Sequence, residues 1–454
     1  MIIKEDYIKS ILTSSLEIVR KYEWLINSYV LDFFVDRHWE KLPNSWKSIE
    51  KVEPEKLCEL LEENVKFTVV WPLSILSLKV IFQKLALNRK PPKESLQKER
   101  QEIFSQKNIK NKFEKNVKLK KRHEIIYMSE ITKYTANKTG AEFVVDFGAG
   151  LGHFARILYY RFNLRVCCIE MQSTLNENAR ILDKNFEEFL HNNSDLKKVD
   201  TPKHITMTLT NSVTPEIFKE EILNAFRITE TESFKFGIVG LHPCGDLAAV
   251  LINMFLKCKA AKFLNLIGCC YMKLTQSRSS ENVGYPLSSF LKYEIANLST
   301  LSYESREIAC HAIEMYVDRL RSGSYNELKV HTYRAIIEQI ITRIYPNKKH
   351  IALRNVKHTT DLDFLTYCEI ATKNTGIDIN KYIDIDEVNE NLSQWKNVVI
   401  FYTLRLLFAP LLESIILYDR VLHLIENGCE VNIEPIFNPR ISPRNHITFA
   451  TKIN

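Results

Sequence analysis

The chain has 454 residues, enough for about three domains of roughly 150 residues each, and it is 45% hydrophobic and 26% charged. This composition excludes a wholly disordered, collagen-like or mucin-like chain, and only 12 glycines and 14 prolines argue against a many-stranded sandwich or propeller. The net charge of +7 is concentrated between Arg89 and Arg122, where 13 Lys/Arg residues stand against four Glu residues.

Residues 1–88 are predicted to form a helical region, because Ile8, Ile11, Leu12 and Leu16 recur at helical spacing. The first residues carry mixed charges and no long apolar run, so no secretory signal is expected. The ten cysteines are therefore expected to be reduced thiols in an intracellular protein, located in the cytoplasm, the nucleus or both.

Two apolar runs, 65–82 and 398–418, have the hydrophobicity of membrane segments but contain proline and charged residues. Charges near the middle of such runs predict buried core helices, and no membrane span is expected. Residues 89–117, within the basic segment Arg89–Arg122, are predicted to be a solvated, partly disordered linker. The alternative is a phosphate-binding strip for nucleic acid, because clustered positive charge attracts polyanions.

Strand and helix patterns alternate after this linker, from residue 118 to residue 275. Alternation of this kind predicts a parallel sheet with helices on both faces. The predicted strands are 143–146, 164–169, 204–209, 236–241 and 263–267, and the predicted helices are 154–162, 176–190, 215–226 and 247–256.

The last part of the chain, residues 395–454, predicts a helix at 407–425 followed by strands at 429–436 and 446–453. A helix and a strand hairpin can extend a five-stranded parallel sheet to seven strands. We therefore expect one domain split in sequence into 118–275 and 395–454. Residues 276–394 would be a mostly helical insertion between strands five and six, with helices at 303–320 and 333–345.

A glycine-rich loop follows the first predicted strand: Asp146, then Gly148, Gly150 and Gly152 at alternate positions. Glycines there let the backbone turn tightly and approach a ligand closely. A dinucleotide fingerprint would require glycine at position 153, which is His153. The pattern instead resembles the first motif of class I S-adenosylmethionine-dependent methyltransferases.

The residue types in this loop suit S-adenosyl-L-methionine. Asp146 can receive the amino group of its methionine part, and the backbone N–H groups of Gly148, Gly150 and Gly152 can receive its carboxylate. Glu170 ends the second predicted strand, 20 residues after Gly150. Its carboxylate can accept hydrogen bonds from both ribose hydroxyls.

Further motifs are more specific. Gly240–Leu247 reads GLHPCGDL and Gly268–Thr275 reads GCCYMKLT, with further matching pieces at 120–125, 284–288, 407–410 and 437–445. These resemble the methyltransferase-like-25 family, which includes proteins named for a ribosomal RNA adenine dimethylase domain. The resemblance covers roughly residues 118–454 and implies a cofactor-binding class I, Rossmann-like, seven-stranded methyltransferase domain.

His242 and Cys244 follow the fourth predicted strand, and Cys269 and Cys270 follow the fifth, so all four should meet at the carboxyl edge of the sheet. Cys244 could be a nucleophile activated by His242, as in C5-pyrimidine methylases. The cysteines could instead bind a metal, or simply pack beneath the cofactor. We predict His242 and Cys244 as catalytic residues that shape the acceptor pocket, and no metal.

Taken together, the sequence predicts an S-adenosylmethionine-dependent methyltransferase acting on RNA or a ribonucleoprotein bound through Arg89–Arg122. A protein substrate is the alternative. A catalytically inactive binding module that keeps the methyltransferase fold is a third reading, which the intact Asp146, glycine loop and Glu170 disfavour.

Overall fold

The computed structural model describes residues 4–91, 107–115, 117–193, 201–229, 234–276, 284–323, 325–356 and 362–452. Within the basic segment, residues 92–106 and 116 thus lie outside the described residues. The chain divides into two compact units. The first comprises Met1–Glu17, Leu87–Leu301 and Glu413–Asn454, and the second comprises Ile18–Ala86 and Ser302–Leu412.

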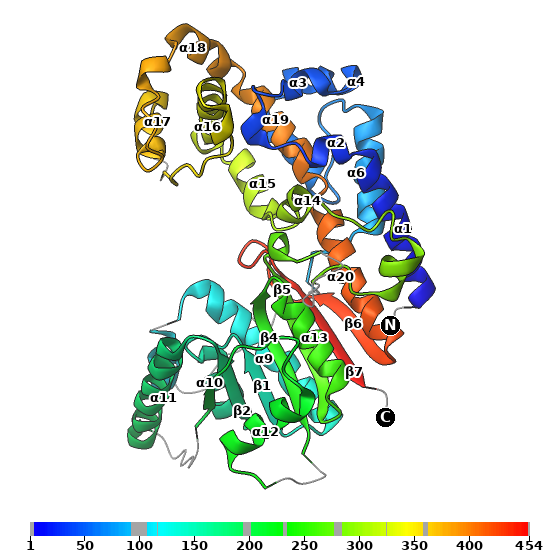
Figure 1. The fold of residues 1–454 in the computed structure, drawn as a ribbon, viewed down its shortest axis with the longest axis vertical. Helices are drawn as coiled ribbons and strands as arrows, with labels where there is room; N and C mark the ends of the chain where they lie inside the picture. The colour runs from blue at the N-terminus through cyan, green and yellow to red at the C-terminus, as the bar shows by residue number, and fades with distance from the viewer. Residues whose placement is uncertain are drawn as a thin grey trace. The chain divides into compact units, whose positions relative to one another are not determined.

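The first unit is built on a seven-stranded sheet with the strand order β3-β2-β1-β4-β5-β7-β6 (Figure 1). Strands β1 to β5 pair in parallel, whereas β7 pairs antiparallel with both β5 and β6. The predicted seven-stranded sheet with a closing hairpin is confirmed. The strands are β1 Phe143–Phe147, β2 Arg165–Glu170, β3 Lys203–Thr206, β4 Phe236–Cys244, β5 Ala261–Cys269, β6 Cys429–Pro435 and β7 His446–Lys452.

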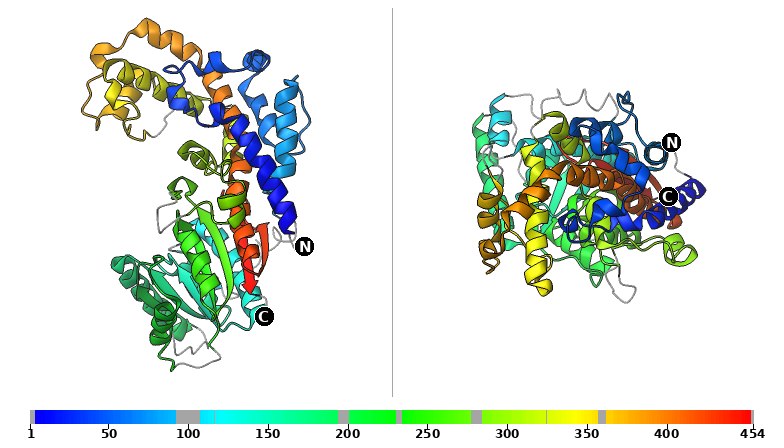
Figure 2. Two further views of the ribbon diagram at one scale, coloured as in Figure 1. Left: turned by 45° about the vertical axis from the view of Figure 1, so that its right-hand side comes forward. Right: turned by 90° about the horizontal axis from the view of Figure 1, so that it is seen from above.

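Helices cover both faces of this sheet (Figure 2). Val144 and Val166 face the core formed with α8, α9, α10 and α11, while Phe147 stacks on Phe218 of α12 on the opposite face. The strands are therefore apolar on both sides, as in other parallel sheets. The bounds are α8 Lys107–Glu114, α9 Leu119–Thr139, α10 His153–Tyr160, α11 Ser173–Asn193, α12 Pro215–Phe226, α13 Leu247–Lys257 and α20 Ala409–Glu426.

Local signals in the sequence set several of these helix ends. Helix α12 begins where Thr214 Oγ1 accepts a hydrogen bond from the Ile217 N–H, with Pro215 at the first helical position. Helix α9 ends at Gly140, whose φ of +65° is left-handed. Gly140 thus ends α9 just before β1, and Thr214 sets the start of α12.

The predicted linker is partly a packed helix. Ile109 and Phe113 of α8 are buried in the same core cluster as α9 and α11. Their spacing of four residues places both on one face of α8. Charged neighbours hide this short apolar stripe in the sequence, which is why the expectation of a solvated connector is wrong for residues 107–114.

The C-terminal segment enters the sheet beside β5 although the whole insertion separates them in sequence (Figure 1). A buried ion-pair cluster accompanies this return, in which Glu413 of α20 accepts from Arg89 at 2.6 Å and from Arg444 at 2.7 Å. The helical stretch Trp395–Glu426 is long and apolar enough for a membrane span, with a mean hydropathy of 1.8, but 89% of that window is buried inside the protein. Such burial is what a core helix requires.

The second unit is mainly helical and has a core of its own, which includes Ile337, Ile341 and Tyr367. The predicted helix 303–320 is broken into two, because His311 Nδ1 hydrogen-bonds the Glu307 carbonyl at 3.0 Å and competes with the helical ladder. The helices of the second unit are α2 Glu23–Ile26, α3 His38–Lys41, α4 Asn44–Lys47, α5 Cys58–Leu61, α6 Leu73–Leu85, α14 Tyr303–Ile308, α15 Ile313–Arg321, α16 Asn326–Ile344, α17 Phe364–Thr372, α18 Ile385–Ser393 and α19 Trp395–Leu406. Helix α1, Glu5–Lys21, begins in the first unit and ends in the second.

Candidate functional site at the carboxyl edge of the sheet

The loop between β1 and α10 has the backbone that its glycines predicted. Gly148, Gly150 and Gly152 adopt φ values of +67°, +56° and +71°, a region that other residues rarely occupy. A Cβ added at Gly148 or Gly150 would meet no atom within 4 Å. The loop therefore presents bare backbone to an open space, as a ligand cradle requires.

Glu170 ends β2 directly beside this loop. Its Oε2 accepts a hydrogen bond from the Gly150 N–H at 3.1 Å, and its Oε1 accepts one from the Gln172 N–H at 3.1 Å. A carboxylate can accept about four hydrogen bonds, so each oxygen keeps a lone pair after holding the backbone. The residue can therefore brace the loop and still receive two hydroxyl groups.

Asp146 lies near the end of β1 and is 2% exposed. Its carboxylate makes no hydrogen bond to any residue that the structure describes, and burial raises its pKa to about 7, although the Lys121 ammonium opposes this shift. A buried carboxylate without donors is unfavourable. A cationic group of a ligand would relieve this cost, so the residue fits the amino group of S-adenosylmethionine.

A buried polar network packs against the glycine loop, and the sequence patterns did not predict it. Arg156 of α10 donates to the Leu151 carbonyl at 2.6 Å and to Asp183 Oδ1 at 2.5 Å. Asp183 Oδ2 also contacts His204 Nε2 at 2.5 Å. Both Arg156 and Asp183 are buried, and the only signal in the sequence is a pair of opposite charges on the apolar faces of two helices.

Asn176 supports the neighbouring strand ends in the same way. Its Nδ2 donates to the Glu170 carbonyl at 3.2 Å and to Thr206 Oγ1 at 2.8 Å, so it joins the ends of β2 and β3. The amide is fully buried at the start of α11. The position of Glu170 is thus fixed both by its strand and by the first turn of the following helix.

His242 is held by an acidic partner from a distant helix. Its Nε2 lies 2.7 Å from Glu124 Oε1, which also accepts from Ser442 Oγ at 2.7 Å. Burial opposes ionisation of Glu124, but these hydrogen bonds and the nearby Lys121 outweigh it and bring its pKa to about 2. An ionised carboxylate only accepts, so His242 Nε2 carries the proton of this hydrogen bond, and Nδ1 takes no part in it.

Three thiols meet next to His242. Cys244 Sγ lies 3.3 Å from Cys269 Sγ and 3.4 Å from Cys270 Sγ. Both His242 and Cys270 have left-handed backbones, with φ of +69° and +51°. Non-glycine residues in this conformation are costly and cluster at functional sites. The structure thus brings together the four residues that the sequence placed at this edge.

The loop between β6 and β7 covers this edge from the other side. The Asn438 N–H donates to His123 Nε2 at 2.9 Å, and Asn445 Nδ2 donates to the Phe437 carbonyl at 3.2 Å. Arg444 is buried, and its guanidinium is bound to Glu413. The side chain of Arg444 is therefore occupied inside the fold and is not directed at a ligand phosphate or carboxylate.

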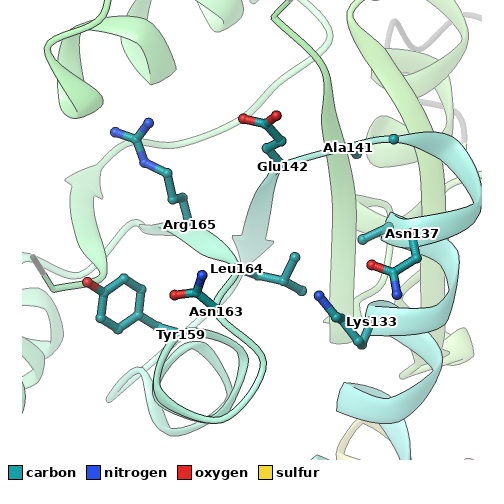
Figure 3. A pocket seen from close by; sticks show the side chains of 10 residues that line it. Lys133, Asn137, Ala141, Glu142, Tyr159, Asn163, Leu164 and Arg165 are labelled. Atoms are coloured by element: carbon teal, nitrogen blue, oxygen red, sulfur yellow. The ribbon is translucent and has the colours of Figure 1, made fainter. Parts of the chain in front are cut away.

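A cavity of about 680 Å³ lies at the opposite, amino end of β1 and β2. Figure 3 shows Lys133 and Asn137 of α9 on one side of it and Tyr159, Asn163 and Arg165 on the other. Ligands of open parallel sheets bind outside the carboxyl ends of the strands. This cavity is therefore separate from the site formed by the glycine loop, Glu170 and His242.

Comparison with known families agrees with this geometry. Residues 120–277 match the model of a family described as a methyltransferase domain, and this stretch contains β1 to β5 and every predicted site residue. The chain contains a methyltransferase domain. Its predicted resemblance to methyltransferase-like protein 25 is also confirmed, since 228 residues are 28% identical to the probable methyltransferase-like protein 25 of Mus musculus.

The probable methyltransferase-like protein 25 of Homo sapiens is 28% identical to this chain over 227 residues. Each alignment covers 47% of this chain but only 37% and 36% of the mouse and human proteins, so the chain matches little more than a third of their length. Solved structures with some likeness include the plantazolicin methyltransferase BpumL in complex with SAH and coclaurine N-methyltransferase bound to N-methylheliamine and SAH.

BpumL is 10% identical with a TM-score of 0.21 and covers 70% of this chain and 94% of its own. Coclaurine N-methyltransferase is 10% identical with a TM-score of 0.24 and covers 99% of each chain. The assignment of the fold therefore rests on the strand order of this chain, which places an antiparallel β7 between β5 and β6.

Proposed function

We propose that the protein is an S-adenosyl-L-methionine-dependent methyltransferase that acts on RNA or on a ribonucleoprotein. The observation that carries the activity is the set of three left-handed glycines between two carboxylates, Asp146 and Glu170. Open space faces Gly148 and Gly150, and the matched methyltransferase domain family supports the same reading.

Each part of the cofactor has a candidate partner in this site. Glu170 would accept hydrogen bonds from the ribose hydroxyls, Asp146 would neutralise the amino group, and the loop N–H groups would receive the carboxylate. When bound, the cofactor supplies a methyl group activated by its sulfonium. The chain's own task is then to orient the acceptor and to move its proton.

His242 suits the proton transfer. Because Glu124 holds Nε2–H, the free Nδ1 can take a proton from an acceptor, and the carboxylate then stabilises the imidazolium that forms. Cys244 is exposed beside it and would line the acceptor side of the pocket. Ionised Glu124 thus gives His242 a fixed orientation, and we assign Glu124 as a positioning residue.

The substrate class is inferred from the basic segment. Arg89 and Arg122 are bound within the fold, to Glu413 and Glu114 respectively. A group of lysines on α8 and at the start of α9 is nevertheless exposed: Lys107, Lys112, Lys115, Lys118 and Lys120. Lys120 stands one helical turn before Glu124, so this positive charge lies on the same helix end as the group that holds His242. Polyanions such as RNA are attracted by such a surface.

The thiols support a proposal for the compartment. None of the ten cysteines is in a disulfide, and Cys244 is exposed. Reduced, exposed thiols suit the cytoplasm or the nucleus, where RNA and ribonucleoproteins are also available. We therefore place the protein in one or both of these compartments.

Methyl transfer from labelled cofactor to fractionated RNA, ribonucleoprotein and protein tests this proposal. We expect label that ribonuclease releases, and none with Asp146→Ala, which should not hold the cofactor. Label that only protease releases would replace RNA by protein as the substrate. Cofactor binding without transfer to any fraction would indicate an inactive binding module.

A charge reversal tests the surface itself. Lys115→Glu combined with Lys118→Glu should lower RNA methylation and weaken its dependence on salt, while cofactor affinity stays unchanged. Lys184→Glu, at an exposed position of α11, is the matched control and should have little effect. Equal effects of both changes would show that only overall charge matters and would remove the segment from the substrate site.

A further inference from the structure

Three cysteines from the ends of β4 and β5 form a compact sulfur cluster, which we call the thiol cluster: Cys244, Cys269 and Cys270. Their ligand atoms all lie within 4.8 Å of one another. Cys244 and Cys269 are also partners in the β4–β5 pairing, with a register shift between Leu241 and Cys244. An irregularity of this kind bends a strand locally.

We propose that the thiol cluster is a binding site for a thiophilic divalent cation, with Zn²⁺ as the expected ion. Zinc bonds to thiolate sulfur at about 2.3 Å, so two sulfurs of a tetrahedral site are about 3.8 Å apart. Cys244 Sγ already lies 3.3 Å and 3.4 Å from its two partners. Side-chain adjustments of about half an ångström would therefore admit the ion.

A second observation supports a charged occupant. Arg420 of α20 is 1% exposed, and its Nε, Nη1 and Nη2 have no hydrogen-bond partner among the described residues. Its guanidinium lies 5.7 Å from the centre of the Tyr271 ring, just beyond the thiol cluster in sequence. A Cβ at Gly268, next to Cys269, would lie only 2.3 Å from Arg420 Nη1.

A buried guanidinium without partners is costly unless negative charge lies nearby. Three thiolates with one divalent cation carry a net charge of −1, which Arg420 would balance. Three neutral thiols offer no such charge. The Asp419 and Asp246 carboxylates already attract this guanidinium, and an anionic metal–thiolate cluster next to Gly268 would add to that attraction, whereas neutral thiols would not.

The same contacts disfavour a nucleophilic Cys244. Its sulfur contacts two other thiols and the His242 carbonyl, and no basic side chain among the described residues accepts its proton. His242 Nε2 is occupied by Glu124. Cys244 is exposed and Cys270 half-buried, so a metal here would have a fourth position open to solvent. Three protein ligands and one open position are typical of catalytic rather than structural zinc.

The full-length protein, purified under reducing conditions, tests this site by elemental analysis and by Co²⁺ substitution. We expect about one zinc per chain, and with Co²⁺ the thiolate charge-transfer absorption and visible bands of a tetrahedral site. Cys244→Ser should weaken Zn²⁺ binding at least about 100-fold while circular dichroism and the melting curve of the metal-free protein stay unchanged. Cys310→Ser, outside the cluster, is the matched control and should bind normally.

Two further variants make the test specific. His350→Ala alters the remaining candidate group of ligands in the described chain, Asp32, Glu338 and His350, and should leave the zinc content unchanged. Arg420→Met should stabilise the metal-free protein and yet weaken Zn²⁺ binding about tenfold, because it removes a buried guanidinium without hydrogen-bond acceptors in one state and a counter-charge in the other.

Three results would overturn the proposal. One is a protein that retains no zinc after exposure to excess metal and removal of the unbound ion. Another is zinc that stays bound at full stoichiometry in Cys244→Ser. The third is a mass two hydrogens lighter than the reduced chain, with a disulfide mapped within the cluster, which would make the cysteines a redox pair.

Discussion

The carboxyl ends of β1 and β2 and those of β4 and β5 carry two different kinds of site. At the first, Asp146, the glycine loop and Glu170 all come from one short stretch, and the network of Arg156 and Asp183 behind them is local as well. At the second, His242 depends on Glu124 and on Ser442, and Gly268, next to Cys269, lies against Arg420.

The cofactor half, at β1 and β2, is therefore a local supersecondary unit. The acceptor half, at β4 and β5, forms only when distant elements pack together. The β6–β7 loop and helix α9 must both be in place before His242 has its partner. The acceptor half should therefore be more sensitive to distant changes. The predictions below test this contrast.

The largest effect is expected from deleting residues 396–454. This removes α20, β6 and β7, exposes the apolar edge of β5, and leaves Arg89 without Glu413. We expect loss of cooperative unfolding of the first unit, measured by circular dichroism during heating. A shortened chain that melts cooperatively as a monomer and binds cofactor would contradict this prediction, because the first unit would then fold without its closing hairpin.

Glu124→Gln should lower methyl transfer strongly without changing cofactor affinity. The amide cannot stabilise the imidazolium of His242, and general-base catalysis is worth about 100-fold to 10,000-fold, so we expect a loss of at least roughly tenfold. Single-turnover rates and calorimetric cofactor binding separate the two effects. Ser442→Ala, which removes only a neutral donor to Glu124, is the control and should act more weakly. An unchanged rate with Glu124→Gln would remove this pair from the mechanism.

Glu170→Ala should weaken S-adenosylmethionine binding by about 1–3 kcal/mol, since charge-assisted hydrogen bonds to the ribose are lost. Calorimetry with the folded variant measures this, with exposed Glu177→Ala on α11 as the control. Unchanged affinity in a folded Glu170→Ala protein would place the ribose elsewhere. Because the residue also holds the Gly150 N–H, the melting temperature should be recorded for both variants.

The smallest effect expected is a pH dependence from Asp146. Burial raises its pKa to about 7, so in the free protein the carboxyl is protonated at acidic pH. A bound cation favours the ionised form, so cofactor affinity should rise between about pH 5.5 and 7, by up to tenfold per pH unit. Asp146→Asn should abolish this slope.

The Asp146 carboxyl should give the free energy of unfolding the opposite pH dependence. Because folding raises its pKa above the unfolded value of 3.8, its contribution to stability is fully present below that value and is lost as the pH rises through about 7. Unfolding curves of wild type and Asp146→Asn across this range measure it. A wild-type cofactor affinity that is flat with pH would show that no cation of the ligand lies against Asp146.

Sequence patterns alone were enough to predict the alternation of strands and helices, the split of the sheet around a helical insertion, and the residues of the cofactor half. Local periodicity and spacing predict these features. For example, glycine occurs at every second residue after Asp146, and an acid stands where the next strand ends. Local patterns survive because neighbouring residues share one strand or one helix.

The acceptor half depends on contacts between elements that are far apart in the sequence. Glu124 and His242 are joined by packing of α9 against the sheet, and Arg444 is turned inwards by Glu413. The sequence also favoured packed cysteines without a metal, because their spacing matches no standard ligand motif. The pairing of β4 with β5 and two left-handed residues bring the three sulfurs together. The spacing of residues along the chain does not predict which strand ends lie side by side. Physically, spacing along the chain determines contacts within an element, whereas contacts between elements depend on how the whole sheet closes.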